Sequence, residues 1–364
     1  MALDIDSDIY SSLLLHYLIF SETASRQNTI PAHHMLRFLI DENIPYIKGR
    51  LEPIGQVTYL DQNDFSHELA SRADAVLIRT RTRANASLLE NTPVRLVATA
   101  TIGTDQIDIP WCDSHGITVR NSPGCNAPAV AQYVWSSLLH QDFNPEKDTL
   151  GIIGCGNVGG IVRQWGEQLG VRMMVCDPFR PDLHTSSLEE IMSQCDAVTL
   201  HTPLTRDGLH PTFHLINEKL LPLMKQDAIL INAARGPVVD FNALREFSRI
   251  RPDIRMVIDT WEGEPAVDPE ILEKAVYATP HIAGYSRLGK ERATRMVLEA
   301  VEEEFGIEID KSGLSGPYRP IPALTAEMIK SSYDPAEDTR TLRAHPSSLE
   351  TLRHDYSYRP ETGE

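Results

Sequence analysis

Short apolar runs alternate with amphipathic stretches along most of the chain. One series lies before residue 122 and a second begins at Thr149; the expected strands are 36–41, 57–60, 75–80, 96–101, 117–121, 149–154, 172–177, 197–201, 228–232, 255–259 and 276–280. Continuous apolar runs separated by helical segments are typical of parallel strands that are buried on both faces. The pattern therefore predicts the α/β class, with two doubly wound parallel-sheet domains.

Two longer helices complete this pattern. A helix is expected over 127–140, because Pro123-Gly124 ends the strand before it and Pro128 suits a first helical turn. It would join the two sheets. A second helix is expected over 290–305. The tail beyond it is rich in Pro and Gly and then in charged residues, which predicts a small third unit.

Residues 1–34 differ from the rest of the chain. They include a polar stretch, and the first clear strand starts only after Met35. We expect a poorly ordered extension, with a short surface helix at 13–20 as an equally good alternative. That apolar stretch is far shorter than the ~20 residues that cross a bilayer, and no Lys or Arg precedes it. Neither a membrane span nor a secretory signal is therefore expected.

Composition narrows the classes of partner. The 364 residues include 34 Lys+Arg and 51 Asp+Glu, for a net charge of −17. A nucleic-acid partner is not expected, because its phosphates require a basic face. The five cysteines are odd in number and form no Cys-x-x-Cys pair, which argues against a disulfide framework and a zinc cluster. We expect no metal site and a cytoplasmic protein.

A glycine-rich turn follows the first strand of the second series. Gly154, Gly156 and Gly159 have the G-x-G-x-x-G spacing and precede a helix expected over 160–169. The first permits a tight turn, the second lets the backbone approach a pyrophosphate, and the third lets helix pack on strand. Asp177 ends the next strand, where a carboxylate accepts hydrogen bonds from ribose hydroxyls and repels a 2′-phosphate. The sequence therefore predicts a Rossmann domain that binds NAD in preference to NADP.

Charged side chains follow three later strands of the same series. Arg235, then Asp259 with Glu264, and finally His281 stand just after successive strands, whose carboxyl ends form the ligand-binding edge of such a sheet. A guanidinium can hold a carboxylate bidentately. A histidine accepts a proton near neutral pH, and a carboxylate partner orients it. We therefore expect His281 to take a hydroxyl proton as a hydride leaves the same carbon, with Glu264 as its carboxylate partner and Arg235 as the group that holds a substrate carboxylate.

At these residues the chain resembles the D-isomer-specific 2-hydroxyacid dehydrogenases, over about residues 35–300. The resemblance implies that Arg235 holds the substrate carboxylate, that Glu264 orients the base and that His281 is the acid/base. It places Asp259 near the nicotinamide carboxamide. The remaining cofactor contacts that it implies, in addition to Arg235, are Asn157, Val158, Thr202, Ala233, Ala234 and Gly284.

The loop at 79–83 carries three arginines in five residues of an acidic protein, which suits a substrate with a phosphate as well as a carboxylate. Arg79, at the strand end, is the expected phosphate ligand. Several segments, among them 41–46 and 261–265, resemble family members that oxidise a phosphorylated sugar acid on the route to pyridoxal 5′-phosphate. That resemblance implies substrate contacts at Thr80, Thr101 and Tyr285.

The tail resembles the dimerisation region of those members, over Tyr333–Asp338 and Leu349–Arg359, and there Arg359 corresponds to a residue that can reach the substrate phosphate. The resemblance implies a homodimer. The predicted organisation is a substrate domain (35–126 and 283–303), an NAD-binding Rossmann domain (127–282) and a C-terminal dimerisation region (304–364).

Two alternatives stay open. The nearer one is a dehydrogenase for another 2-hydroxy acid, such as phosphoglycerate or glycerate. The more distant one is a non-catalytic, NAD-responsive binding module on the same fold, because a fold does not fix a function.

Overall fold

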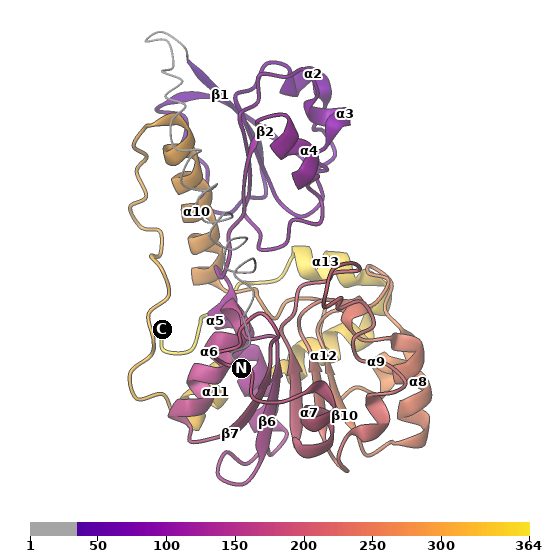
Figure 1. Ribbon diagram of the computed structural model, residues 1–364. Helices are drawn as coiled ribbons and strands as arrows, with labels where there is room; N and C mark the ends of the chain where they lie inside the picture. Colours follow the sequence, from indigo (N-terminus) through magenta and orange to yellow (C-terminus); the bar gives the residue numbers. More distant parts are fainter. Residues whose placement is uncertain (1–34) are drawn as a thin grey trace, which may run out of the picture. The chain divides into compact units, whose positions relative to one another are not determined.

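The first parallel sheet contains five strands, β1 (Leu36–Asp41), β2 (Gly55–Leu60), β3 (Ala75–Ile78), β4 (Leu96–Thr99) and β5 (Thr118–Arg120). The structure is a computed structural model that describes residues 35–364; the expected extension 1–34 and its alternative helix at 13–20 lie outside this range. The strand order is β2-β1-β3-β4-β5, and the β1–β3, β3–β4 and β4–β5 pairs are parallel (Figure 1). Short helices accompany this sheet: α2 (His67–Ala70), α3 (Ala86–Leu89) and α4 (Ile109–Ser114).

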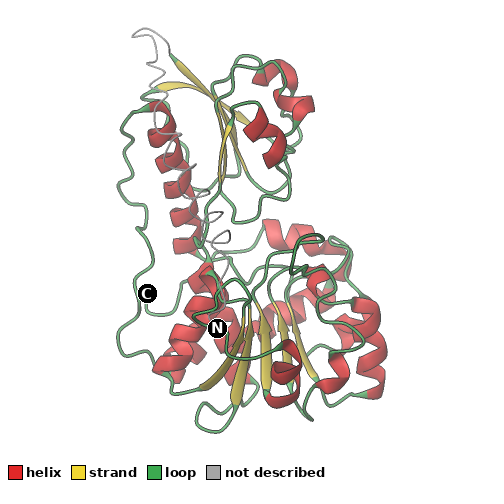
Figure 2. Cartoon of the chain, in the orientation of Figure 1, coloured by secondary structure: helices red, strands yellow, loops and turns green. Residues whose placement is uncertain are grey.

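The second sheet contains six strands, β6 (Thr149–Ile153), β7 (Arg172–Cys176), β8 (Ala197–Leu200), β9 (Ile229–Asn232), β10 (Arg255–Ile258) and β11 (Tyr277–Ala278). Its order is β11-β10-β9-β8-β6-β7, and every neighbouring pair is parallel. Both sheets are drawn in yellow in Figure 2. Because β6 lies between β7 and β8, the chain leaves it toward one side and returns on the other. Ligands bind at such a switch point, beyond the carboxyl ends of the strands.

Helices cover both faces of the second sheet. Leu150 and Ile152 of β6 belong to a buried cluster with α5 (Ala127–His140) and α6 (Asn157–Gln168). Ile153 belongs to the cluster on the opposite face, with α7 (Leu188–Gln194), α8 (Phe241–Ile250) and α9 (Pro269–Lys274). Two 3₁₀ turns, Leu221–Leu223 and Gly236–Val238, lie among these elements. This arrangement confirms the predicted doubly wound α/β class.

The helix α10 (Arg287–Phe305) follows β11 and packs against β4 and β5 of the first sheet. Ser286 caps it, accepting a hydrogen bond from the backbone of Gly289 at 3.0 Å. The helix was expected only from residue 290; the cap moves its start back to Arg287. Similarly, β11 ends two residues before the expected strand end, because Pro280 has no N–H to donate to a sheet.

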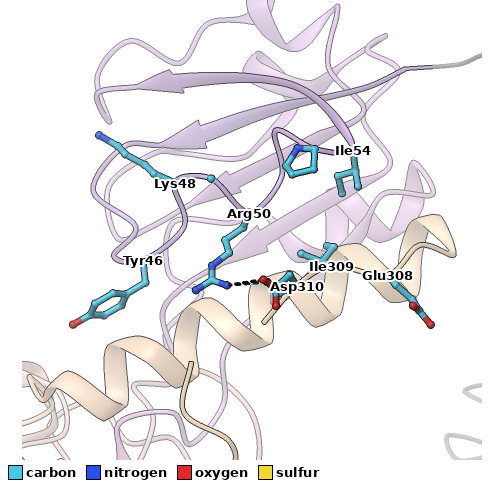
Figure 3. A pocket seen from close by; sticks show the side chains of 9 residues that line it. Tyr46, Lys48, Arg50, Ile54, Glu308, Ile309 and Asp310 are labelled. Atoms are coloured by element: carbon cyan, nitrogen blue, oxygen red, sulfur yellow. Dashed lines mark hydrogen bonds and ion pairs between the residues drawn. The ribbon is translucent and has the colours of Figure 1, made fainter. Parts of the chain in front are cut away.

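The loop between β1 and β2 meets the segment just after α10. Arg50 donates to the carbonyl of Asp310 at 3.0 Å and to that of Ser312 at 2.9 Å, and it also pairs with the Asp310 carboxylate (Figure 3). A shallow pocket lies here, lined by residues that include Tyr46, Lys48 and Ile309. These contacts hold the start of the tail beside the first sheet.

The C-terminal tail folds onto the second sheet. It contains α11 (Ala326–Ser332), α12 (Pro335–Ala344), a 3₁₀ turn (Pro346–Ser348) and α13 (Leu349–His354). Ile329 is buried in the cluster that contains α5, and Leu342 and Leu349 are buried in the cluster on the opposite face. The small third unit that was expected here therefore shares the core of the second sheet. No helix between residues 35 and 364 combines the length and the apolar character needed to cross a membrane.

Candidate active site

The glycine turn after β6 has the geometry that its spacing predicts. Gly154 has a φ of +85°, and a Cβ there would lie 2.8 Å from the carbonyl oxygen of His201. A Cβ on Gly159 would overlap the carbonyl oxygen of Gly154, so only glycine lets α6 approach the strand this closely. A Cβ on Gly156 would meet nothing within 4 Å, which leaves its backbone open to a ligand.

The start of α6 suits a phosphate. The helix begins at Asn157, followed by Val158, and no side chain caps it. The first N–H groups of any α-helix lack an intrahelical acceptor, and they lie at the positive end of the helix dipole. Without a side-chain cap, those of α6 are available to a phosphate.

Asp177 directly follows β7, the strand end from which its carboxylate is expected to contact the ribose of the cofactor. Its carboxylate is 8% exposed and accepts hydrogen bonds from the backbone of Cys155 at 2.7 Å and of Phe179 at 3.0 Å. The nearby cation that could favour a 2′-phosphate, Arg180, is engaged in an ion pair with Asp182 at 2.9 Å. The local charge therefore favours NAD.

A buried hydroxyl provides a separate test of whether this site fits NAD. The Oγ1 atom of Thr202, just after β8, is buried and has no hydrogen-bond partner among the described residues. A buried polar atom without a partner is rare and calls for a ligand or water. Among the other expected cofactor contacts, Ala233 and Ala234 form the loop after β9, and Gly284 packs so closely on Asn126 that a Cβ would overlap its side chain.

Arg235 stands on a loop that is fixed by buried polar contacts. The Asn232 side chain, fully buried at the end of β9, donates to the carbonyl of Arg235 at 3.0 Å and accepts from the N–H of Ala234 at 3.2 Å. The guanidinium reaches the loop that follows β4: a Cβ on Gly103 would lie 2.5 Å from it, and Asp105 is 3.8 Å away.

Thr101 belongs to the same loop as Gly103, where its hydroxyl bonds to Thr99 at 2.7 Å and donates to the Gly103 carbonyl at 2.9 Å. Two predicted substrate contacts, Arg235 and Thr101, are thus brought together by this loop.

Glu264 and His281 form a hydrogen-bonded pair. The Nδ1 atom of His281 lies 2.8 Å and 3.1 Å from the two carboxylate oxygens, and Glu264 also accepts from the N–H of Trp261 at 2.7 Å. Burial by itself raises the pKa of Glu264, but His281 and the Trp261 N–H outweigh it and hold the pKa below its ordinary value. An ionised partner at Nδ1 leaves Nε2, for which the structure gives no partner among the described residues, as the proton acceptor.

The Arg235 loop and the Glu264 loop touch directly. A Cβ on Gly236 would overlap the backbone of Trp261 and would lie 2.5 Å from the N–H nitrogen of Glu262. Glu262 is in turn held by His214 at 2.6 Å and by the backbone of Phe241 at 2.9 Å.

His214, Asp240 and Glu262 have ligand atoms within 4.8 Å of one another, but these atoms already bond to each other and to α8, whose N-terminus Asp240 caps. The group tethers the loop that carries Glu264.

The loop from residue 279 to residue 286, which we call the His281 loop, is held in a strained conformation. His281 has a φ of +58°, in the left-handed region, which costs a non-glycine residue about 1–3 kcal/mol. Asp259, only 1% exposed, accepts from the N–H of Ile282 at 2.7 Å, of Ala283 at 3.0 Å and from the hydroxyl of Thr279 at 2.7 Å. Burial is the largest influence on Asp259 and raises its pKa.

Cations gather around Tyr285. The Lys290 ammonium lies 3.6 Å from the centre of its ring, and Arg353 of α13 donates to its hydroxyl at 2.9 Å. Burial by itself raises the pKa of Tyr285, but the charges of Lys290, Arg353 and Arg79 lower it overall. Arg79 donates to the carbonyl of Asn43 at 3.0 Å. None of the three cations has a carboxylate partner among residues 35–364.

The neighbouring residues of the arginine loop differ from Arg79. Arg81 forms an ion pair with Glu350 of α13, Arg83 is exposed without a partner in the described part of the chain, and Thr80 is exposed. Sequence reasoning missed Lys290 and Arg353. Lys290 stands five residues after Tyr285 and offered a weak signal; Arg353 offered none, because only the folded tail brings it to this site.

Arg359 lies in a different environment from the one expected. It is 7% exposed, and all five of its N–H groups have acceptors, which are the carbonyl oxygens of Ala129, Ile282, Ala283 and Tyr285 and the side-chain oxygen of Gln132. No donor is left for a phosphate. The geometry thus argues against the expected substrate contact, and the tail contributes Arg353 to the cations around Tyr285.

Comparison with known proteins shows the family and the fold of the chain. Residues 120–283 match the family model described as D-isomer specific 2-hydroxyacid dehydrogenase, NAD binding domain. A 3-phosphoglycerate dehydrogenase from Entamoeba histolytica with bound NAD⁺ has the same fold, with a TM-score of 0.63 and 23% identity over 74% of this chain and 95% of that one. A D-lactate dehydrogenase from Aquifex aeolicus gives a TM-score of 0.60 and 25% identity, over 73% and 94%.

The chain belongs to the D-isomer-specific 2-hydroxyacid dehydrogenase family and is an NAD-dependent oxidoreductase. Among its relatives are proteins named erythronate-4-phosphate dehydrogenase. The one from Bacteroides fragilis is 40% identical over 90% of this chain and 98% of its own length. The one from Escherichia coli is 38% identical over 90% and 92%.

Proposed function

We propose that this protein oxidises the C2 hydroxyl of erythronate 4-phosphate to the 2-oxo acid, as part of pyridoxal 5′-phosphate synthesis. The relatives' name supports the substrate. The observation that carries the proposal is the cluster of Arg79, Lys290 and Arg353 around Tyr285, three cations for which residues 35–364 offer no carboxylate partner, in a protein of net charge −17. Such a cluster in an acidic protein suits a dianionic phosphate.

The substrate carboxylate would pair with Arg235, beside Thr101. The Nε2 atom of His281 would then take the proton of the C2 hydroxyl, while Glu264 holds Nδ1–H and stabilises the imidazolium that forms. When bound on the turn at 154–159, NAD accepts the hydride that leaves C2. The product is 2-oxo-3-hydroxy-4-phosphobutanoate.

A substrate panel tests the proposal by the formation of NADH. Erythronate 4-phosphate is expected to give the highest kcat/KM, ahead of 3-phosphoglycerate, glycerate and unphosphorylated erythronate. A 2-oxo acid in the assay reoxidises cofactor that stays bound. A higher kcat/KM with another acid would identify that acid as the substrate in place of erythronate 4-phosphate. No turnover with any 2-hydroxy acid would favour the alternative of a non-catalytic, NAD-responsive binding module.

A matched pair of variants tests the phosphate cluster. In Arg353→Ala, the kcat/KM for erythronate 4-phosphate should fall by about 10- to 100-fold, the usual worth of a hydrogen bond to a charged group. The value for an unphosphorylated acid should change little. The control is Arg83→Ala, which changes an exposed arginine four residues after Arg79 and should behave as wild type. Equal losses of kcat/KM for the phosphorylated and the unphosphorylated acid would show that Arg353 does not bind the phosphate.

We further propose a homodimer and a cytoplasmic location. The homodimer rests on the resemblance of the tail to a dimerisation region. Light scattering after gel filtration should give about twice the chain mass of 40.7 kDa, and a mass near 40.7 kDa would refute the dimer.

A further inference from the structure

The His281 loop is bonded on two sides by groups of opposite charge. Its N–H groups at Ile282 and Ala283 donate to the carboxylate of Asp259. Its carbonyl groups at Ile282, Ala283 and Tyr285 accept from the guanidinium of Arg359. Asp259 directly follows β10 of the second sheet, whereas Arg359 stands 78 residues beyond His281 in the C-terminal tail.

The guanidinium of Arg359 is also held by α5, in addition to its contacts with the His281 loop. Its Nε atom donates to the Gln132 side chain at 3.0 Å, and Nη2 also donates to the carbonyl of Ala129 at 3.0 Å, so α5 holds one edge of the fork. Its Nη1 atom donates to Ile282 at 2.8 Å and to Tyr285 at 3.2 Å. A planar fork with all five donors engaged can occupy this place in one orientation only.

The backbone around Arg359 is anchored as well. The carbonyl of Arg359 accepts from the N–H of Arg287 at 3.1 Å, and two residues later Glu361 pairs with the buried Arg292 and accepts from the Ser286 hydroxyl at 2.6 Å. The end of the tail is thus bound to both the end of the His281 loop and the start of α10.

We propose that Arg359 is a positioning residue for the reaction: through the three loop carbonyls it holds His281 and Tyr285 in place, so that the C-terminal tail completes the active site. A non-glycine residue keeps a left-handed conformation only where its surroundings fully determine the backbone. At the His281 loop, Asp259 binds only N–H groups, and Arg359 binds the carbonyl groups. The inference rests on the role of His281 in the proposed function. It replaces the expected contact of Arg359 with substrate.

The matched control is Arg255, which also donates to backbone carbonyls. It binds those of Asp227 and Gln141 at the amino-terminal end of β10, whereas Asp259 follows the carboxyl end of that strand. Arg255→Met removes three such bonds far along the strand from the site. It should lower the melting temperature and leave kcat unchanged.

Arg359→Met should lower kcat with erythronate 4-phosphate by about 100-fold, the size of effect that a displacement of ~1 Å produces at a reacting group. Amide hydrogen exchange of the peptide that contains Ile282 and Ala283 should accelerate, while it stays slow in Arg255→Met. Arg359→Lys, which keeps the charge and some donors, should recover part of kcat and serves as the variant if Arg359→Met does not fold.

A kcat for Arg359→Met equal to that of Arg255→Met, with unchanged exchange at the loop, would overturn the positioning role. Hydrogen exchange is read without substrate, so it separates this inference from the proposed function. If the wild type does not oxidise erythronate 4-phosphate, the proposed function fails, whereas the loop contact of Arg359 is still judged by its exchange.

Discussion

The proposed role of His281 as the base rests on the different surroundings of its two ring nitrogens. Glu264 occupies Nδ1 at 2.8 Å, and the His281 side chain is 25% exposed, so Nε2 is the atom that a substrate can meet. The carboxylate fixes the tautomer, and Asp259 and Arg359 fix the backbone on which the ring stands. The surroundings of one imidazole thus depend on three charged side chains from two segments, the loop after β10 and the C-terminal tail.

His281→Asn should lower kcat by about 10²–10⁴-fold, because amide nitrogen cannot accept the hydroxyl proton. NAD affinity, measured by calorimetry, should stay close to that of the wild type. His345→Asn changes an exposed histidine of the tail and provides the control. Turnover within a few-fold of wild type would exclude His281 as the base.

The cation cluster should respond to alkaline pH. Burial lowers the pKa of Lys290 to about 8, so its ammonium loses its proton and its charge as the pH rises through that value. The kcat/KM for erythronate 4-phosphate, which reports groups of the free enzyme, should therefore decline above about pH 8. In Lys290→Arg this decline should move to higher pH, because a guanidinium stays charged.

Unphosphorylated erythronate serves as the control substrate, for which no such decline should depend on residue 290. The same alkaline decline in Lys290→Arg and in the wild type would assign it to another group.

The loops after β9, β10 and β11 are the elements that make the site. Each follows a buried parallel strand, and two are braced by a buried polar side chain: Asn232 for the first, and Asp259 for the third. The first two loops also pack backbone against backbone at Gly236, with no room for a side chain. Arg235 and Glu264 are therefore set relative to each other by main-chain contact.

Gly236→Ala should separate these two loops, because the added methyl group would overlap the carbonyl of Trp261. We expect a loss of kcat/KM of at least about 10-fold from misplaced groups. Gly316→Ala is the matched control, since a Cβ there meets nothing within 4 Å. Steady-state kinetics of both variants decide the point, and wild-type activity in Gly236→Ala would show that the loops adjust.

For the whole molecule, the glycine turn at 154–159, the Glu264–His281 pair and the folded tail are all supported by the second sheet and its core. Leu150 and Ile152 of the strand before the turn belong to the same buried cluster as Ile329 of the tail. A ligand that binds this part of the native protein should therefore stabilise the chain as a unit.

NAD at 100 times its Kd should add about 2.7 kcal/mol to the free energy of unfolding, and so raise Tm. NADP at equal concentration should raise Tm less, because Asp177 repels the 2′-phosphate. In Asp177→Ser the difference between the two cofactors should shrink. Thermal melts measure all four cases; equal shifts with NAD and NADP in the wild type would contradict the assignment of Asp177.

The sequence alone determined the strands, the helix over 127–140 and the glycine turn. Each depends on neighbours a few residues away: apolar runs, a proline in a first turn, and glycines where a strand meets a helix. Arg235, Glu264 and His281 could also be predicted as a site, because each follows a strand and such ends meet at one edge. Local sequence patterns are sufficient to predict these features, because the fold repeats a regular strand–helix unit.

Only the tertiary structure decided which cations lie around Tyr285 and which groups Arg359 contacts. Arg353 and Arg359 are six residues apart in the tail, yet one reaches the hydroxyl of Tyr285 and the other is fully bonded inside the core. That difference depends on how the C-terminal tail runs across two helices and a loop that are distant from it in sequence. No local sequence pattern predicts this course, because it is set by the packing of surfaces that meet only after folding.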